Sequence, residues 1–314
     1  MKKLITIIGP TAIGKTALSI KLAHYFNTEN ISCDSRQFFK EMTIGTAVPS
    51  REELALATHH FIQNKSIFDP YTVGDFEKEA LQKLESLFQK NNFAILVGGS
   101  GLYVDAILRG FDYFPEVESS IRTTIQNNYE KQGIAYLQTQ LKESDLSYYN
   151  FLEKTNPQTL QNPQRLMRFV EVSLGTGQPY SSFLGQEKKQ RNFSSIIIGL
   201  EAERSILYHR INERVDNMIR AGLVEEAKNV YEFKNLNALQ TVGYRELFDY
   251  FDGKISLEIA IEEIKKNTRR FAKRQMTWFK RTENVQWFDY QRDIAEIVNY
   301  IKKSLTQKNE QPFS

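Results

Sequence analysis

The chain alternates short apolar, β-branched runs with longer stretches in which apolar residues recur every three or four positions. Buried strands are predicted at residues 4–8, 31–33, 93–97, 195–200 and 285–288. Helical periodicity predicts helices at about 15–26, 75–90, 102–109, 203–221 and 256–281. Strands that alternate with helices predict an α/β fold with a parallel sheet, in which ligands bind at the carboxyl ends of the strands.

The alternation stops after residue 111, where Gln, Asn and Tyr become frequent and no strand is predicted. Asn162 and Pro163 have the pattern of a helix start, an N-cap followed by proline at the first helical position, and Gly175 is expected to end that helix. The predicted organisation is an α/β core of residues 1–111 and 191–303, a helical insertion of residues 112–190 and a flexible tail of residues 304–314.

The composition is that of a globular protein, with 314 residues of which 41% are hydrophobic and 25% charged. No apolar run approaches the roughly 18 residues that span a bilayer, and the first run is too short for a signal peptide. Because Cys33 is the one cysteine, an intrachain disulfide is excluded. His59 and His60 are consecutive in the sequence, and we interpret them as structural because the side chains of consecutive residues point apart. We therefore expect a cytoplasmic protein that has no membrane segment.

A phosphate-binding pattern, G-x-x-x-x-G-K-T, follows the first predicted strand. It consists of Gly9, Pro10, Thr11, Ala12, Ile13, Gly14, Lys15 and Thr16. The glycines let successive backbone N–H groups face an anion, the lysine adds a point charge, and the Thr16 hydroxyl is a ligand for Mg²⁺. The pattern therefore predicts a site for a diphosphate or triphosphate at a helix N-terminus, with Mg²⁺ as the cofactor.

This loop leaves three classes of protein open: a small-molecule kinase, a nucleic-acid NTPase, and a transferase that uses a non-nucleotide diphosphate. An NTPase usually has an acidic residue directly after a second apolar strand, but here Gly98 and Gly99 follow the strand at 93–97. Asp34 follows the strand at 31–33. Because all these segments follow strand ends, we expect them to share one crevice.

The formal net charge is only +3, yet residues 265–281 contain eight Lys or Arg and no acidic residue. At helical spacing, one half of the circumference is cationic and the other half carries Ile264, Phe271, Trp278 and Phe279. Such a face suits a polyanion such as RNA, and a merely solvated face is the alternative. The cations are Lys265, Lys266, Arg269, Arg270, Lys273, Arg274, Lys280 and Arg281.

Seven motifs in order resemble those of the tRNA dimethylallyltransferases, the bacterial tRNA isopentenyltransferase family. They are GPTAIGKT (9–16), DSRQ (34–37), IGTA (44–47), VGGS (97–100), QRLMR (164–168), VGYR (242–245) and KRQMTW (273–278). The resemblance implies a P-loop NTPase-like fold. It also implies an enzyme that transfers a dimethylallyl group from dimethylallyl diphosphate to N6 of adenosine 37 in tRNA. A P-loop phosphotransferase and a non-catalytic RNA-binding protein are the alternatives.

The resemblance also implies roles for individual residues. Asp34 would be the general base, Thr11 would contact the departing oxygen, and Arg214 would help to bind diphosphate. The chain is expected to be a monomer, and Phe39 and Val48 stand where the family often has Tyr and Lys. Contacts with the tRNA anticodon stem-loop are implied for Asp34, Ser35, Arg36, Gln37, Ser100, Arg122, Gln164, Arg165, Leu166, Met167, Arg168, Val242, Gly243, Tyr244, Arg245, Lys273, Arg274, Gln275, Trp278 and Lys280.

Overall fold

The computed structural model describes residues 2–112, 114–185 and 190–306. The chain folds into two compact units, with divisions between Arg109 and Gly110 and between Lys189 and Gln190. We call the unit that contains both ends of the chain the core unit, and the unit between these divisions the helical unit. Each is described by itself.

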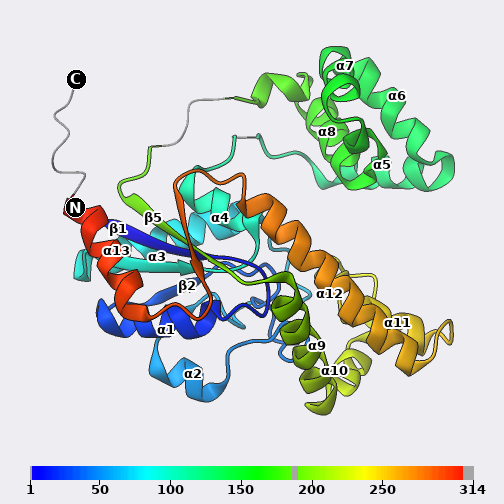
Figure 1. Ribbon diagram of the computed structural model, residues 1–314. Coiled ribbons are helices and arrows are strands. Elements are labelled where there is room, and N and C mark those ends of the chain that lie inside the picture. Colours follow the sequence, from blue (N-terminus) through cyan, green and yellow to red (C-terminus); the bar gives the residue numbers. More distant parts are fainter. Residues whose placement is uncertain (1, 113, 186–189, 307–314) are drawn as a thin grey trace, which may run out of the picture. The chain divides into compact units, whose positions relative to one another are not determined.

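Six parallel strands form the sheet of the core unit (Figure 1), in the order β3-β2-β4-β1-β5-β6. Their bounds are β1 (Lys3–Ile8), β2 (Asn30–Ser32), β3 (His59–His60), β4 (Phe93–Val97), β5 (Ser194–Glu201) and β6 (Val285–Asp289). The predicted parallel α/β fold is confirmed, and each predicted strand is present. Because all the strands run the same way, their carboxyl ends lie along one edge of the sheet.

Helices cover both faces of this sheet (Figure 1). The α-helices of the core unit are α1 (Lys15–Tyr25), α2 (Arg51–Leu56), α3 (Val73–Lys90), α4 (Gly101–Leu108), α9 (Arg204–Arg220), α10 (Leu223–Asn229), α11 (Tyr244–Phe251), α12 (Leu257–Phe279) and α13 (Ile294–Thr306). Among the described residues, no helix is both long and apolar enough to cross a bilayer.

Strand β1 builds two core layers, because alternate residues of a strand point to opposite faces. Leu4 and Ile8 pack in an apolar cluster with residues of α3 and α4. Ile5 and Ile7 pack in a second cluster with residues of α1 and α13. All four side chains are fully buried, which explains why both faces of this strand are apolar at these positions; Thr6, between them, is a buried polar residue.

A third apolar cluster lies where α9, α10, α11 and α12 pack together, beyond the sheet (Figure 1). Leu223, Leu247 and the whole Tyr244 ring are fully buried in it. Phe39 belongs to the same cluster and is 6% exposed, so the residue that replaces the family's usual Tyr is a core residue here. The cluster fixes α9 and α12, which both send side chains to the phosphate-binding loop.

The helical unit is built from α5 (Ser119–Gln132), α6 (Ile134–Ser144), α7 (Leu146–Thr155) and α8 (Pro163–Thr176), with short 3₁₀ turns at Pro157–Gln161 and Tyr180–Phe183. Asn162 caps α8 as predicted, because its side chain accepts a hydrogen bond from the Arg165 N–H. Leu137, Leu141 and Val170 are fully buried in the apolar cluster that holds the four helices together.

The structure differs from the predicted elements in three places. Gly175 lies inside α8, which continues to Thr176 and ends at the left-handed Gly177. Gly175 is needed for packing instead, since a Cβ there would lie 2.2 Å from the Val117 Cγ1 atom. The short strand β3 was not predicted. The expected tail from residue 304 is helical through Thr306, and residues 307–314 lie outside the described residues.

Candidate active site

The loop between β1 and α1 borders an open cavity of about 440 Å³. Gly14 has a φ of +106°, in the left-handed region that favours glycine, and Ala12 also has a positive φ of 65°. The N-terminus of α1 has no side-chain cap. Its first backbone N–H groups are therefore available to an anion, and the helix dipole favours negative charge there.

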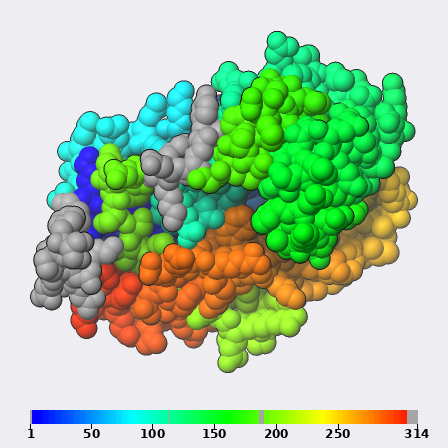
Figure 2. Space-filling view, turned by 90° about the horizontal axis from the view of Figure 1, so that it is seen from above, coloured from blue at the N-terminus to red at the C-terminus, as the bar shows by residue number. Residues whose placement is uncertain are grey.

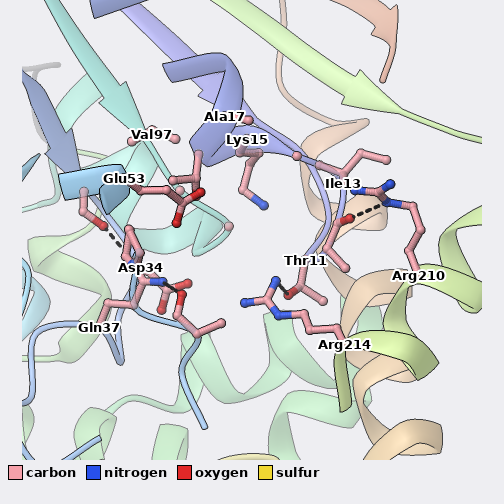
Figure 3. Close-up of a pocket in the computed structure, with 18 of the residues that line it drawn as sticks. Thr11, Ile13, Lys15, Ala17, Asp34, Gln37, Glu53, Val97, Arg210 and Arg214 are labelled. Carbon is pink, nitrogen blue, oxygen red and sulfur yellow. Dashed lines mark hydrogen bonds between the residues drawn. The ribbon is translucent and has the colours of Figure 1, made fainter. Parts of the chain in front are cut away.

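Three strand ends meet at this cavity, as the sequence predicted. The phosphate-binding loop follows β1, Asp34 follows β2, and Gly98 and Gly99 follow β4; all of them line the cavity. In Figure 3, Lys15, Asp34 and Arg214 point into one space from three sides. A carboxylate, an ammonium group and a guanidinium thus face the ligand volume.

Two arginines of α9 hydrogen-bond to the phosphate-binding loop (Figure 3). The Arg210 Nε donates to the Ala12 carbonyl at 2.9 Å, and the Arg214 Nη1 donates to the Thr11 Oγ1 at 3.3 Å. Both line the cavity. Arg210 was missed, although its four-residue spacing from Arg214 within a predicted helix places both on one helix face. The structure thus brings Thr11 and Arg214 together, as their predicted roles require.

Lys15 is partly buried in the cavity wall, and its Nζ donates to the Pro10 carbonyl at 2.7 Å. Burial lowers the pKa of Lys15 to about 8, the Asp34 carboxylate counteracts this effect, and the Arg214 guanidinium adds to it. Burial also lowers the pKa of Arg214, against the charges of Asp34 and Glu53. The site therefore holds two desolvated cations close together, an arrangement that an incoming anion would stabilise.

Gln275 of α12 joins two of the loops that form the cavity. Its Oε1 accepts a hydrogen bond from the Thr11 N–H at 2.9 Å, and its Nε2 donates to the Gly99 carbonyl at 2.8 Å. A Cβ on Gly99 would lie 2.3 Å from that Nε2, so the close approach needs glycine. Gln275 is 6% exposed. Gln275 therefore has a structural role, because it orients the backbone of Thr11, and its contact with RNA stays a prediction.

The segment that carries Asp34 is tied down at both sides. The Ser100 Oγ accepts from the Ser35 N–H at 3.0 Å, and the Gln37 Nε2 donates to the Ala47 carbonyl at 2.9 Å. The Asp34 carboxylate accepts from the Arg36 N–H at 3.0 Å, which fixes its orientation. Ser100 and Gln37, both expected at the RNA, therefore act here on the segment that contains the candidate base.

A second cavity, of about 290 Å³, adjoins the first. Thr11, Asp34 and Arg214 line both cavities, so they stand at the boundary between them. The second cavity collects many residues that the resemblance assigned to RNA binding. These are Ser35, Arg36, Val242, Gly243, Arg245 and Arg274.

Glu226 of α10 supports the wall of the second cavity, and sequence reasoning missed it. Its carboxylate accepts hydrogen bonds from three successive backbone N–H groups, those of Thr43, Ile44 and Gly45, at 2.9, 2.7 and 2.8 Å. It also accepts from the Tyr244 hydroxyl at 2.7 Å. Gly45 lines the cavity. Nothing in the local sequence could identify this carboxylate, because its backbone donors lie about 180 residues away.

Four residues of the expected RNA-contacting set are buried or engaged elsewhere. Leu166 and Met167 are core residues of the helical unit, and Tyr244 is a core residue of the bundle around α10. Their side chains cannot reach RNA without unfolding, because their apolar surface fills the interior. The Trp278 indole donates to the Asp105 carboxylate at 2.9 Å and remains 39% exposed, so the apolar half of the predicted basic helix is not fully packed.

The cationic surface of α12 is weaker than the sequence predicted. Figure 2 shows α12, in orange, along the surface of the core unit. The helix ends at Phe279, and three of its expected cations are paired with carboxylates from outside the stretch: Lys265 with Asp216, Lys266 with Glu263, and Lys280 with Glu201. Arg270 and Lys273 are exposed, and no carboxylate among the described residues pairs with them.

Oxygen donors suited to Mg²⁺ lie in the first cavity. The Thr16 hydroxyl and the carboxylates of Asp34 and Glu53 all line it. Among the described residues, no group of three or more His, Cys, Asp or Glu gathers as a metal site. That pattern fits Mg²⁺, which keeps several waters and is held by one or two protein oxygens together with substrate phosphates. The residues present therefore fit the cofactor.

A parallel sheet with this loop after its first strand defines an α/β protein of the P-loop class with a cationic ligand cavity. A family model described as IPP transferase matches residues 37–282, and the chain belongs to this family. It is 67% identical to the tRNA dimethylallyltransferase of Flavobacterium johnsoniae, over 97% of this chain and 99% of that protein. It is 56% identical to that of Christiangramia forsetii, over 96% and 98%.

The chain is also similar to solved structures of this family. The tRNA isopentenylpyrophosphate transferase of Bacillus halodurans is 36% identical, with a TM-score of 0.72 and 99% of each chain covered. A eukaryotic dimethylallyltransferase acting on tRNA is 26% identical, with a TM-score of 0.80, and covers 100% of this chain and 81% of its own. The family suggested by the sequence motifs is thereby confirmed.

The lowered pKa of Lys15 predicts a pH dependence of ligand binding. An ammonium group binds diphosphate better than an amine, so affinity for dimethylallyl diphosphate should fall as pH rises above about 8, approaching about tenfold per pH unit. Lys15→Arg keeps the cation and should bind with little change between pH 7 and 9.5. Calorimetric titration at several pH values measures this. Equal wild-type affinity across that range would show that Lys15 does not titrate in the site.

The hydrogen bonds of Glu226 predict that the Glu226→Gln variant loses activity toward tRNA more than it loses affinity for dimethylallyl diphosphate. One of the two oxygens becomes an NH₂ group that accepts no hydrogen bond, so at least one backbone N–H of the cavity wall loses its acceptor. We expect kcat/KM for tRNA to fall about tenfold or more, while KM for dimethylallyl diphosphate changes less than threefold. Glu225→Gln, an exposed neighbour on the same helix, is the control. Equal kinetics for the two variants, with equal melting temperatures, would contradict a positioning role.

Proposed function

We propose that this protein transfers a dimethylallyl group from dimethylallyl diphosphate to N6 of adenosine 37 in tRNA, giving N6-isopentenyladenosine and diphosphate. The observation that carries the proposal is the position of Asp34 at the boundary between the two cavities. A diphosphate would occupy the first cavity and a nucleoside the second. The carboxylate would then face the amine that reacts.

In the reaction that we propose, the N6 lone pair forms a bond to C1 of the dimethylallyl group. The bond between C1 and the diphosphate oxygen breaks, and its electron pair leaves with the diphosphate. The exocyclic amine of adenine is a weak nucleophile because its lone pair is delocalised into the ring. Asp34 accepts the N6 proton as the new bond forms, which is the role of a general base.

The leaving diphosphate carries negative charge, which the cationic groups of the first cavity would stabilise. Lys15, Arg214 and the free N–H groups at the N-terminus of α1 supply the positive charge. Thr11 would contact the departing oxygen, and its hydrogen bonds with Gln275 through the backbone and with Arg214 through the hydroxyl support this role. Mg²⁺, for which we assign the Thr16 hydroxyl and the Glu53 carboxylate as ligands, would neutralise further diphosphate charge.

The RNA would be held by the cationic groups of α12 and of the second cavity. Loop bases are the usual targets of RNA-binding proteins, and adenosine 37 must leave its stack to reach Asp34. Arg36, Arg245 and Arg274 around the second cavity suit the phosphates of the flipped nucleotide. We expect the protein to act as a monomer in the cytoplasm, where its tRNA substrate is found.

The transfer can be tested directly by mass spectrometry of nucleosides from unmodified tRNA incubated with dimethylallyl diphosphate. The wild-type protein should add one five-carbon group to one adenosine. Asp34→Ala should lower turnover by roughly 10²- to 10⁴-fold with tRNA affinity changed less than threefold, because it removes the base and leaves the RNA-binding cations.

Glu85→Gln on α3 removes an exposed carboxylate and serves as the control. An Asp34→Ala protein within threefold of wild-type turnover would overturn the assignment of the base. Phosphate transfer from ATP, with no change in the mass of the tRNA nucleosides, would favour the phosphotransferase alternative.

The exposed cations of α12 predict a change in the salt dependence of tRNA binding. Each lost phosphate contact should reduce the slope of log K against log salt by roughly 0.7 to 0.9. Replacing Arg270 and Lys273 by Gln should therefore flatten the slope by about one to two units. The control replaces Lys78 and Lys90, exposed on α3, and changes the net charge equally. Equal slopes in two folded double variants would show that α12 does not meet the RNA backbone.

A further inference from the structure

The chain passes between the core unit and the helical unit twice, after Arg109 and before Gln190. We call these two places the crossings. Arg191 follows the second crossing, and its side chain reaches the residues that precede the first. Its Nε donates to the Ile107 carbonyl at 2.9 Å, and its Nη2 donates to the Ala106 carbonyl at 2.6 Å. One side chain therefore joins the chain on the core-unit side of both crossings.

The two carbonyls belong to the last turn of α4, which ends at Leu108. Carbonyl groups at the C-terminus of a helix lack partners within the helix, and the helix dipole favours a cation there. The Arg191 guanidinium supplies both the donors and the charge. Gly110, two residues beyond the helix, has a φ of +76°, in the left-handed region that favours glycine. The end of α4 and the turn of the chain thus coincide with the first crossing.

An ion pair with α3 also holds this guanidinium. The Arg191 Nη2 lies 2.8 Å from the Glu77 Oε1, and the two side chains are only 11% and 9% exposed. Loss of hydration offsets much of the attraction in such a pair, so it adds little stability compared with two apolar side chains. It does keep the planar guanidinium in one orientation, in which its N–H groups meet the α4 carbonyls. The pair is therefore better explained by positioning than by stability.

Helix α4 connects these bonds to the candidate active site. Ser100 caps the other end of the helix, and its Oγ accepts the Ser35 N–H at 3.0 Å, directly after Asp34. In the middle of the helix, the Asp105 carboxylate accepts from the Trp278 indole of α12 at 2.9 Å. A helix of this length spans only about 12 Å. One short, fixed helix thus holds the segment of the candidate base at one end and both crossings at the other.

We propose that Arg191 is a positioning residue for tRNA binding, because it anchors both crossings to the end of α4. The resemblance to the tRNA dimethylallyltransferases implies that one tRNA contacts residues of both units. Any part of the crossings that is free beforehand must then be ordered when the RNA binds, which weakens binding. An anchor that is already formed avoids part of this cost. Dimethylallyl diphosphate would bind within the core unit and does not need the anchor. The proposal rests on the proposed function, because it takes tRNA as the substrate.

The experiment replaces the ion pair in the full-length protein by Arg191→Met together with Glu77→Met, which we call the double Met variant. Two apolar side chains leave no lone buried charge, so the core unit should stay folded, and its melting temperature is measured. Ordering one freed backbone residue costs a factor on the order of ten in affinity. We therefore expect KM for unmodified tRNA to rise about tenfold, while kcat and KM for dimethylallyl diphosphate change less than threefold.

A second ion pair of α3 provides the matched control. Lys65 and Glu79 lie 2.7 Å apart in the core unit and make no bond to the crossings. Replacing both by Met should leave KM for tRNA within threefold of the wild-type value. Arg191→Lys retains a cation and a hydrogen-bond donor, so it should raise KM for tRNA only about threefold. Equal rises in KM for tRNA and for dimethylallyl diphosphate in the double Met variant would indicate general damage to the core unit and overturn the proposal.

Hydrogen exchange of the backbone amides at residues 106–112, measured without RNA, tests the anchor itself. Exchange there should be at least threefold faster in the double Met variant, because the end of α4 and the first crossing lose their shared partner. Exchange in the phosphate-binding loop should stay unchanged. Equal exchange at residues 106–112 in the variant and the wild-type protein would show that Arg191 does not anchor the crossing, and the proposal would fail.

The same kinetic measurements separate failure of this proposal from failure of the proposed function. If the wild-type protein modifies tRNA and a folded double Met variant has a KM for tRNA within threefold of the wild-type value, the anchor is rejected and the proposed function stands. If the wild-type protein transfers no dimethylallyl group to tRNA, the proposed function is rejected, and the positioning role falls with it. The two failures are therefore distinguishable.

Discussion

The parallel pairing of β1, β2 and β4 is the constraint on which the site depends. In parallel pairing the chain leaves every strand at the same edge, so the segments after these strands must share one volume. That volume holds the phosphate-binding loop, Asp34 and Gly99. The pairing also leaves Cys33 packed beneath Gly98, where a Cβ would lie 2.5 Å from the cysteine sulfur. Burial of the thiol raises its pKa, so Cys33 is a packing residue and not a nucleophile.

Hydrogen bonds from distant helices then hold these segments in place. Gln275 reaches the backbone of Thr11 and Gly99, and Glu226 binds three backbone N–H groups of the next loop. A loop alone has many conformations, and ordering it costs about 1–2 kcal/mol for each residue. The buried Gln275 amide and the partly buried Glu226 carboxylate offset that cost, which favours ordered segments before any ligand binds. The base Asp34 and the cations Lys15 and Arg214 are thereby held around one cavity.

The cationic groups of the molecule have different surroundings in three regions. Inside the first cavity, Lys15 and Arg214 are desolvated and face a volume suited to an anion. Along α12, carboxylates of the helix itself and of other elements neutralise part of the charge, whereas Arg270 and Lys273 are exposed and pair with no carboxylate of the described residues. On the helical unit, two arginines line one open recess, although the unit has no net positive charge. Cations that are buried or grouped in this way favour particular ligands, whereas evenly spread charge does not.

The sequence by itself determined the parallel α/β fold, the phosphate-binding loop, the place of Asp34 and the family. These follow from local patterns: apolar runs, the spacing of two glycines before a lysine, and short motifs in a fixed order. Tertiary structure alone decided that Gln275 holds the phosphate-binding loop, that Glu226 supports the second cavity and that Leu166 and Met167 lie in a core. It also decided which cations of α12 stay free. The physical reason is that hydrogen bonds and ion pairs join residues up to 264 positions apart in the chain, and only the fold brings such residues within bonding distance.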